Sequence, residues 1–439
     1  MTPAFRYKMV VAPFTIRLNE DSIRLAILSP EMGAPAARAA ELSWHWAAAG
    51  HEVTVLTGFP NHPTGVVPPE YRDKFQRLIL REQIDGVNVI RTWLLPFPNR
   101  KAYERILNYS SFCASSGLTG LLLSRPDVVI ATSPQLLVAL SGWWLAWCKR
   151  VPFVFEVRDL WPESLAAVGM GSSSLLYKIL AKLAAFLYRR SDRVVVVTSA
   201  FEDHLVKHWR VPRNKISVIE NGVETDLFSP EAGTSLQEEL RTGGKFVVSY
   251  IGTMGMAHGL ETIIQSAAQL QETNPEVDFL MVGEGAEKER MIAMAAASNL
   301  RNLRFVDQQP REKVPAYIRA SDVCLVLLKK SDVFKTVIPS KMLEFMSCGR
   351  PVILGVDGQA RAILEEACGG LAIEPENAAA LASAIRYLAA NRETARELGK
   401  NGRAYVIRRF SRSRSAEQYI RTLEELLGLP ERRRTEVAA

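Results

Sequence analysis

Long apolar runs, paired cysteines and clustered histidines are all missing from this sequence of 439 residues. No stretch of about 18 consecutive apolar residues occurs, so the usual criterion predicts no membrane-spanning helix. The five cysteines are scattered without a C-x-x-C pair, which favours a reducing compartment and argues against a structural zinc site. His204 and His208 have the i,i+4 spacing of metal ligands, but neither a third ligand nor an H-E-x-x-H pattern accompanies them. We therefore interpret them as part of a polar helix face.

Residues 1–22 are predicted to form a poorly structured N-terminal extension. Their apolar run is short, Pro13 interrupts it, and no small-residue cleavage site follows, so we expect no export signal. The net charge of +7 indicates an anionic partner, which could be a phosphorylated small molecule, a membrane surface or a nucleic acid. The basic runs "RRFSRSRS" and "ERRR" are typical of solvated surface, so we expect no nucleic acid partner.

Short β-rich runs alternate with helical stretches in both halves of the chain. Continuous apolar strands that alternate with helices predict a parallel sheet covered on both faces. The fold class is therefore α/β, with two doubly wound Rossmann-like domains facing across a cleft, and ligands of such sheets bind outside the carboxyl ends of the strands. The predicted strands are residues 23–29, 51–57, 87–92, 126–132, 152–159, 192–199 and 216–221 in the first half, and 246–252, 277–283, 303–307, 322–328, 351–356 and 370–375 in the second.

A polar stretch separates the two halves and sets the predicted domain boundaries. We expect an N-terminal domain at residues 23–227, a linker at 228–245 and a C-terminal domain at 246–410. Residues 411–439 are predicted to form a C-terminal helix and a basic tail that packs back on the first domain.

Three glycine- or proline-marked turns in the second half are candidates for anion binding. In "YIGTMGMAHGLETI" a strand leads into a glycine-rich turn and a helix, so backbone N–H groups and His258 would face an anion. "MVGEGAEKE" is a second such turn, and a Pro-Ser-Lys helix start is the third. Neither glycine turn is G-x-G-x-x-G, which argues against a dinucleotide, and a lone glycine turn is as often only a tight turn. Together the three turns would bind a nucleotide diphosphate.

Glu344 stands out in "FKTVIPSKMLEFMSCGRPVILG" because it lies among large apolar residues of a predicted helix. A surface glutamate that pairs with Lys341 at i,i+3 is one interpretation. A carboxylate that serves a ligand at the start of this helix is the other.

Two uncharged segments, residues 106–124 and 136–148, come close to membrane-like composition. Their lengths fit either buried core helices or helices that lie in a membrane interface. Residues 176–190 place Lys178 and Lys182 among leucines, alanines and aromatics, a composition typical of an amphipathic helix on anionic lipid.

Seven segments, in this order, resemble the retaining family-four glycosyltransferases of GT-B fold: "SPEMGAPAARAAELSWHWAAAGHEVTVLT", "EVRDLWPES", "VIENGVETDLFSP", "YIGTMGMAHGLETI", "VGEGAEKERM", "IPSKMLEFMSCGRPVI" and "GRAYVIRRFSRSRSAEQY". The chain is most similar to the subgroup that serves O-antigen, capsule and colanic-acid synthesis. The resemblance runs from about Ile23 to Leu426, nearly the whole chain.

The resemblance implies that the second domain binds a nucleotide-sugar. The second glutamate of the family's E-x7-E element matches Glu344, which would hold the ribose hydroxyls. The first glutamate would stand at Thr336, a departure from the family pattern. Relatives also carry an arginine and a lysine where this chain has Thr253 and His258, so the positive charge at the diphosphate would come from Lys335 or Lys341.

The remaining site residues are also carried over from the resemblance. Arg158 stands where many relatives have a histidine near the reacting centre, and no protein base, metal or cofactor is expected. The expected electrostatic stabilisers of the reaction are Arg158, His258, Lys335 and Lys341. The expected donor-binding residues are Gly33, Thr253, Gly283, Glu284, Ser340, Met342 and Glu344, and the expected acceptor-side residues are Glu31 and Asp159.

The implied activity is transfer of a hexosyl or N-acetylhexosaminyl group from a nucleotide-sugar, expected to be a UDP-sugar, to a glycan or polyprenyl-linked acceptor in bacterial surface polysaccharide synthesis. The expected location is cytoplasmic, peripheral at the inner face of the plasma membrane, against an anionic surface. A sugar-nucleotide 2-epimerase of the same two-domain form is an alternative, as is a non-catalytic protein that binds a nucleotide-sugar or another solute between two lobes. The scarcity of histidines argues against the epimerase, and the lack of an export signal argues against an exported solute-binding protein.

Overall fold

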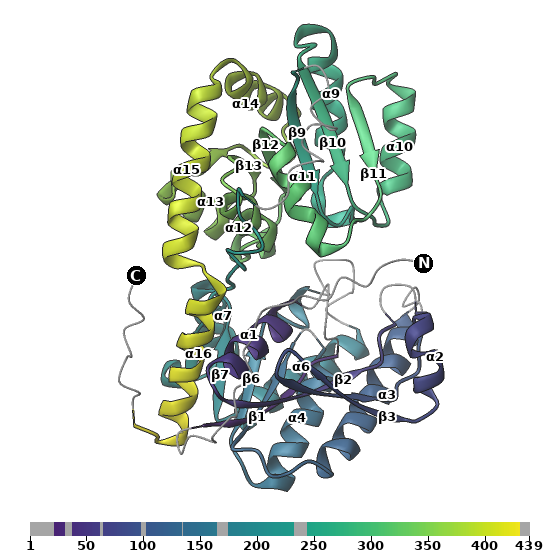
Figure 1. The fold of residues 1–439 in the computed structure, drawn as a ribbon, viewed down its shortest axis with the longest axis vertical. Helices are drawn as coiled ribbons and strands as arrows, with labels where there is room; N and C mark the ends of the chain where they lie inside the picture. The colour runs from purple at the N-terminus through teal and green to yellow at the C-terminus, as the bar shows by residue number, and fades with distance from the viewer. Residues whose placement is uncertain are drawn as a thin grey trace.

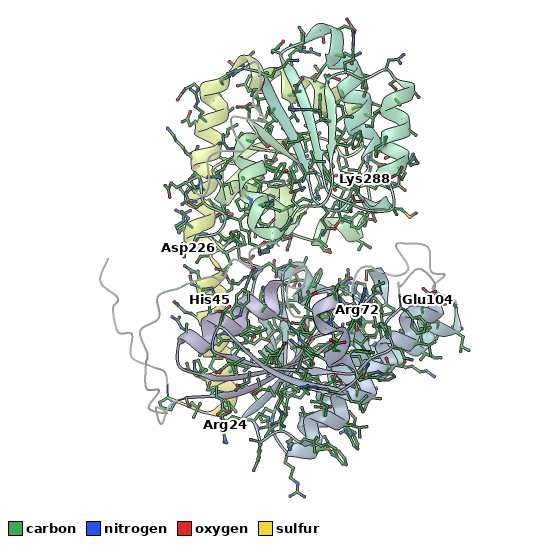
Figure 2. All side chains as sticks on the ribbon, turned by 45° about the vertical axis from the view of Figure 1, so that its right-hand side comes forward. Arg24, His45, Arg72, Glu104, Asp226 and Lys288 are labelled. Atoms are coloured by element: carbon green, nitrogen blue, oxygen red, sulfur yellow. The ribbon has the colours of Figure 1, made fainter. Side chains whose placement is uncertain are left out.

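The computed structural model describes residues 22–30, 37–61, 65–97, 102–133, 135–164, 174–231 and 244–430 as two α/β lobes stacked along the long axis (Figure 1). Each lobe is built on one sheet with helices on both faces, which confirms the predicted pair of doubly wound domains. Figure 2 places Lys288 in the upper lobe and His45 and Arg72 in the lower one. Among the described helices none is long and apolar enough to cross a membrane.

The lower lobe holds an eight-stranded sheet in the order β3-β4-β2-β1-β5-β6-β7-β8. Alternate residues of its strands enter different core clusters, for example Leu25 and Ile27 in one and Ala26 and Leu28 in the other, because successive side chains point to opposite faces. The strands are β1 (Arg24–Leu28), β2 (Glu52–Gly58), β3 (Ile79–Ile84), β4 (Val87–Thr92), β5 (Val128–Thr132), β6 (Phe153–Val157), β7 (Arg193–Val196) and β8 (Ile216–Val218). The helices are α1 (Ala37–Ala48), α2 (Pro69–Phe75), α3 (Ala102–Leu121), α4 (Leu136–Lys149), α6 (Leu175–Arg190) and α7 (Ser199–Trp209).

Strand β3 is the one element of this sheet that the periodicity did not predict. It pairs antiparallel with β4, whereas the strand pairs β1–β2, β1–β5, β2–β4, β5–β6, β6–β7 and β7–β8 are parallel. Its residues are all exposed or only partly buried, so it lacks the continuous apolar run of the parallel strands. The Asp85–Gly86 turn, with positive φ at both residues, is the short-range hairpin signal that could have revealed it.

The upper lobe holds a six-stranded sheet, parallel throughout, in the order β11-β10-β9-β12-β13-β14. Its strands are β9 (Phe246–Ile251), β10 (Val277–Val282), β11 (Leu303–Val306), β12 (Val323–Leu327), β13 (Val352–Gly355) and β14 (Gly370–Ala372). Its helices are α9 (Glu261–Thr273), α10 (Lys288–Ala297), α11 (Val314–Ala320), α12 (Ser340–Ser347), α13 (Gln359–Glu366), α14 (Ala378–Ala390) and α15 (Arg392–Arg409).

Helix α16 (Arg412–Leu427) returns the chain to the lower lobe, where it packs on α1 (Figure 1). The Trp46 indole N–H donates to the carbonyl of Ala416 at 3.0 Å, and its ring meets that of Tyr419 edge-on at 5.1 Å between centroids. A side chain at Gly222 would come within 2.9 Å of the Arg412 backbone, so this crossing requires glycine. The two lobes are thus connected twice by the chain.

Candidate functional site

Two glycine turns meet at the carboxyl edge of the upper sheet, after β9 and β10. Gly283 has a φ of +147°, and a Cβ there would lie 2.0 Å from the Gly252 carbonyl oxygen, so only glycine fits. The Met254 N–H donates to the Glu284 carbonyl at 2.7 Å. This backbone-to-backbone packing fixes the two turns side by side, at the place where ligands of such sheets bind.

Lys341, in the first turn of α12, reaches under the first glycine turn. Its Nζ donates to the Tyr250 hydroxyl at 3.0 Å and lies 4.2 Å from the centre of that ring. The Tyr250 hydroxyl in turn donates to the carbonyl of Thr253 at 2.6 Å. Burial lowers the pKa of Lys341 to about 7, although the carboxylate of Glu344 acts in the opposite direction. The ammonium group is therefore poised to lose or hold its proton near neutral pH.

His258 closes the same cluster from the short helix η2 (Met256–His258). Its Nδ1 lies 3.1 Å from the carbonyl of Gly255, and because a carbonyl only accepts, this nitrogen carries the proton and donates it. Burial, and then the charge of Lys341, lower the pKa of His258 to about 4. At neutral pH the ring is uncharged, and an anion nearby would favour its protonation.

The acidic residue of the second turn is tied to helix α10. The carboxylate of Glu284 accepts from Lys288, which also pairs with Asp307 at 2.6 Å. The Glu284 side chain remains about half exposed, at 48%.

Glu344 does not form the i,i+3 pair with Lys341 that one interpretation of the sequence allowed. Its Oε1 accepts from Nη1 of Arg311 at 3.2 Å, while Lys341 turns to Tyr250. Burial raises the pKa of the Glu344 carboxyl, and the neighbouring Arg311 lowers it. Glu344 is thus a mostly buried carboxylate on the helix whose first turn carries Lys341.

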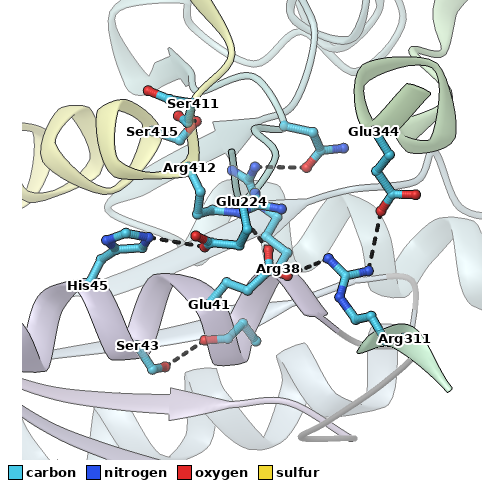
Figure 3. A network of polar contacts seen from close by, with 12 residues as sticks. Arg38, Glu41, Ser43, His45, Glu224, Arg311, Glu344, Ser411, Arg412 and Ser415 are labelled. Atoms are coloured by element: carbon cyan, nitrogen blue, oxygen red, sulfur yellow. Dashed lines mark hydrogen bonds and ion pairs between the residues drawn. The ribbon is translucent and has the colours of Figure 1, made fainter. Parts of the chain in front are cut away.

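Arg311 also reaches the lower lobe, as Figure 3 shows. Its Nη2 donates to Oε1 of Glu41 on α1 at 2.6 Å, and Nε of Arg412 donates to the other oxygen of Glu41 at 2.7 Å. Arg311, Glu41 and Arg412 were missed by the sequence analysis. A charged residue inside the apolar helix "AARAAELSWHW" was the one local signal, comparable to that of Glu344.

Arg158 and Asp159 follow β6 at the carboxyl edge of the lower sheet. The N–H of Arg158 donates to the hydroxyl of Ser133 at 2.7 Å, and its side-chain Nε is buried without a hydrogen-bond partner among the described residues. Burial lowers the pKa of Arg158, whereas Glu156 and Glu41 act to raise it. Burial likewise raises the pKa of Asp159, and its carboxylate accepts from the Trp161 indole at 3.2 Å.

The segment before α12 carries Lys335, one of the two lysines expected to supply positive charge at the diphosphate. Lys335 lies in the short helix η4 (Val333–Thr336) and pairs with Asp332 at 2.7 Å in an exposed position. The Thr336 hydroxyl donates to the carbonyl of Val333 at 2.7 Å, so it is used within its own turn. The carbonyl of Thr336 accepts from Thr198 of the lower lobe at 3.2 Å.

Of four further predicted site residues, two lie in the described part of the chain and two lie outside it. Ser340 is exposed at the start of α12, whereas the side chain of Met342 is fully buried in the core and only its backbone can meet a ligand. Gly33 and Glu31 lie outside the described residues.

Metal ligands are not gathered anywhere in the described part of the chain. No group of three histidine, cysteine, aspartate or glutamate side chains that could hold an ion occurs there. His204 lies against His208, with ring centres 4.5 Å apart, and its Nε2 contacts Glu163 at 3.0 Å.

Two family matches together cover most of the chain. Residues 33–222 match the family described as "Glycosyl transferase 4-like domain", and residues 233–405 match "Glycosyl transferases group 1". The chain is 26% identical over 372 residues to the putative colanic acid biosynthesis glycosyl transferase WcaI of Escherichia coli K12, covering 82% of this chain and 89% of that protein. It is 27% identical over 265 residues to the probable glycosyltransferase WbjE of Pseudomonas aeruginosa, covering 60% of this chain and 66% of that one.

Solved structures share the whole two-lobed arrangement. Sucrose-phosphate synthase from Thermosynechococcus elongatus superposes with a TM-score of 0.72 at 23% identity, covering 92% of this chain and 99% of that one. Anabaena Alr3699/HepE, solved in complex with UDP-glucose, has a TM-score of 0.68 at 16% identity and covers 92% of this chain and 100% of its own. These likenesses confirm the predicted GT-B fold.

Lys341 provides a test of the site's electrostatics without any ligand. Its pKa is about 7 in the folded chain against 10.5 for an ordinary lysine, so between these values the unfolded chain binds more protons. The free energy of unfolding should therefore rise with pH above about 7, by up to ~1.4 kcal/mol per pH unit. We expect Lys341→Met to lose this rise, measured by urea unfolding at about pH 7 and pH 9. The exposed control Lys400→Met should keep it, and a wild-type slope in Lys341→Met would contradict the lowered pKa.

Proposed function

We propose that this chain, which belongs to the group 1 glycosyl transferases, the family-four enzymes of GT-B fold, is a retaining glycosyltransferase. Its proposed donor is a UDP-sugar, and its proposed acceptor is a lipid-linked glycan of surface polysaccharide synthesis, the kind of process named for the similar WcaI. One observation carries the donor assignment. The two locked glycine turns, Lys341 and His258 form an anion-binding edge directly beside the carboxylate of Glu344. A nucleoside diphosphate matches both features, because its diphosphate fits the anion-binding edge and its ribose hydroxyls fit the carboxylate.

The diphosphate would be held by charge that appears when it binds. Burial lowers the pKa values of Lys341 and His258, and an adjacent anion favours the charged form of both. The N–H groups of the two turns supply further donors, apart from those of Gly252, Met254 and Gly283, which already donate to backbone carbonyls. Glu344 accepts the ribose hydroxyls, as its match to the family's second glutamate implies. The solved HepE complex with UDP-glucose, a protein of the same fold, supports this class of donor.

In the proposed reaction the bond from the sugar carbon to the diphosphate oxygen breaks, and the acceptor oxygen bonds to that carbon on the same face. The acceptor proton passes to a donor phosphate oxygen, so no protein base is required. Lys341 and His258 stabilise the charge that grows on the departing UDP. Arg158 and Asp159 lie on the lower lobe, the side proposed for the acceptor, and Lys335 is a more distant contributor because Asp332 already pairs with it.

A lipid-linked acceptor is supported by an apolar face on the lower lobe, which we call the α3–α4–α6 face. Helix α4 packs between α3 and α6, and Trp143 meets Phe186 at 4.7 Å between ring centres. Exposed Lys178 and Lys182 lie on α6 within this face. The large exposed apolar side chains of the face are Ile106, Leu107, Leu118, Leu121, Leu122, Trp144, Trp147, Leu175 and Ile179.

The α3–α4–α6 face is suited to the inner surface of the plasma membrane. Exposed leucines and tryptophans would enter the interface, and basic side chains would meet anionic headgroups. The similarity to WcaI, a putative glycosyl transferase of colanic acid biosynthesis, supports a surface polysaccharide as the product. The protein is then peripheral at the cytoplasmic face.

Donor binding is tested first. In thermal shift measurements with a panel of UDP-, GDP- and TDP-sugars, we expect UDP-sugars to give the largest stabilisation. Glu344→Ala should weaken UDP binding by about 1.5 to 3 kcal/mol, the range for hydrogen bonds to a charged group, as measured by calorimetry. Glu397→Ala, an exposed glutamate on α15, is the matched control. Wild-type UDP affinity in a folded Glu344→Ala protein would reject the ribose contact, and a largest shift by another base would reject UDP.

Metal dependence is tested by turnover. Lys341, His258 and the turn N–H groups supply the stabilisation that a bound cation would otherwise give, so release of UDP in the presence of a lipid-linked acceptor extract should continue in excess chelator. The assay compares untreated and chelator-treated protein, with and without acceptor. Loss of turnover that Mg²⁺ or Mn²⁺ restores would contradict this assignment. Interconversion of the free nucleotide-sugar without transfer would favour the epimerase, and donor binding with neither reaction would favour a non-catalytic binding protein.

Membrane association is tested with vesicles. Each basic residue near an anionic surface contributes roughly 1 kcal/mol, so binding to vesicles with anionic lipid should be strong at low salt and fall as salt is added. Charge reversal in Lys178→Glu/Lys182→Glu should weaken it, as should Trp147→Ser on the apolar part of the face. Lys400→Glu, in the upper lobe, should bind like the wild type. A protein that ignores such vesicles at low salt would point to a soluble acceptor.

A further inference from the structure

We propose that Arg311 is a positioning residue that sets the ribose-binding carboxylate of Glu344 and links it to Glu41 of the opposite lobe, so that donor binding and the alignment of the two lobes depend on one guanidinium. This inference rests on the proposed donor site. One planar group makes both contacts, with Nη1 at 3.2 Å from Glu344 and Nη2 at 2.6 Å from Glu41 (Figure 3).

The lower end of this link is itself firmly held. Both oxygens of Glu41 are occupied, one by Arg311 and the other by Nε of Arg412 at 2.7 Å, and the Glu41 side chain is only 3% exposed. Arg412 begins α16, which packs on α1, so the Glu41–Arg412 pair belongs to the lower lobe alone. Arg311 is what extends this pair to the upper lobe.

In the upper lobe, the guanidinium of Arg311 is oriented by its position in the chain and by a neighbouring aromatic ring. Arg311 begins the short helix η3 (Arg311–Lys313), and its guanidinium lies 5.1 Å from the ring of Phe228, in the segment between the lobes. A guanidinium can stack on a ring and fork to two carboxylates at once, which an ammonium group cannot do. The position therefore demands arginine for geometric reasons as well as for charge.

Glu344 retains one oxygen for the donor. Oε1 takes Arg311, and no hydrogen bond to Oε2 is made by the described residues. The charged groups that act on this carboxyl are Arg311 of η3, Glu41 of α1, Arg412 of α16 and Lys341 of its own helix. Burial raises its pKa, and Arg311 is the largest influence in the other direction.

Removal of Arg311 would leave two buried carboxyl groups facing each other with no cation between them. Like charges raise each other's pKa, so Glu344 would take up a proton as the pH falls and would lose its capacity to accept both ribose hydroxyls. The loss of donor affinity relative to wild type should then be largest in acid and should shrink as the pH rises. Lys341 titrates in both proteins, so comparing the two affinities at the same pH removes most of its own contribution, although the carboxylate of Glu344 also acts on it.

The experiment measures the Kd of UDP by calorimetry for wild type and Arg311→Met at about pH 6 and pH 8.5. We expect Arg311→Met to bind about tenfold or more weakly at the lower pH, the scale of a charged hydrogen bond, and to recover most of this at the higher pH. The control Arg301→Met, an arginine that is 81% exposed beside Glu272, should match wild type at both values. Wild-type affinity in Arg311→Met at both pH values, or a loss that does not change with pH, would overturn the proposal.

Glu41→Gln separates the two ends of the link. It leaves Arg311 on Glu344, so UDP affinity should stay near wild type, while kcat for sugar transfer should fall by about tenfold at unchanged KM for the donor because the lobes lose their tie. An unchanged kcat would overturn the cross-lobe part. If Arg311→Met does not fold, the UDP affinity of Arg311→Lys is measured in its place. The lysine ammonium can reach only one of the two carboxylates, so we expect weaker UDP binding than in wild type. If wild type itself binds no UDP, the proposed function fails and not this inference alone.

Discussion

The buried carboxylate of Glu41 is where charged side chains of the two lobes meet, in addition to the hydrogen bond from Thr198 to the carbonyl of Thr336. Helix α1 carries Glu41, α16 brings Arg412 to one oxygen and η3 brings Arg311 to the other. Three parts of the chain that are far apart in sequence therefore meet at one charge. A buried carboxylate is costly unless its partners are well aligned, so the arrangement selects one geometry rather than adding much net stability.

The electrostatics of the donor edge also depend on charged groups that are buried. The first glycine turn carries Thr253 and His258, and Lys341 lies inside against Tyr250. With pKa values of about 7 and about 4, the lysine is only partly charged and the histidine is uncharged at neutral pH. In the proposed site, a bound diphosphate would favour the charged forms of both groups.

Local features of the fold and of the candidate site could be predicted from the sequence, whereas the long-range contacts could not. The two doubly wound sheets follow from alternating apolar strands and helices, and the exception, β3, has no fully buried residue and lacks that pattern. Glu344 could be singled out because a charge in an apolar helix is visible in a few residues of sequence. Its partner Arg311 could not, because 33 residues separate the two and their pairing depends on how the segment after β11 and the first turns of α12 come together at the same edge of the sheet.

The two lobes divide the demands of the proposed reaction between them. The upper lobe offers a compact anion-binding edge with its charges buried, which suits a soluble phosphorylated donor. The lower lobe carries most of the exposed leucines and tryptophans, on α3, α4 and α6, which suits an acceptor held in a lipid layer. Such a division works only if the lobes keep their alignment, because the reacting atoms come from opposite sides. The double crossing of the chain and the Glu41 cluster are both positioned to provide that alignment, one through the backbone and the other through charge.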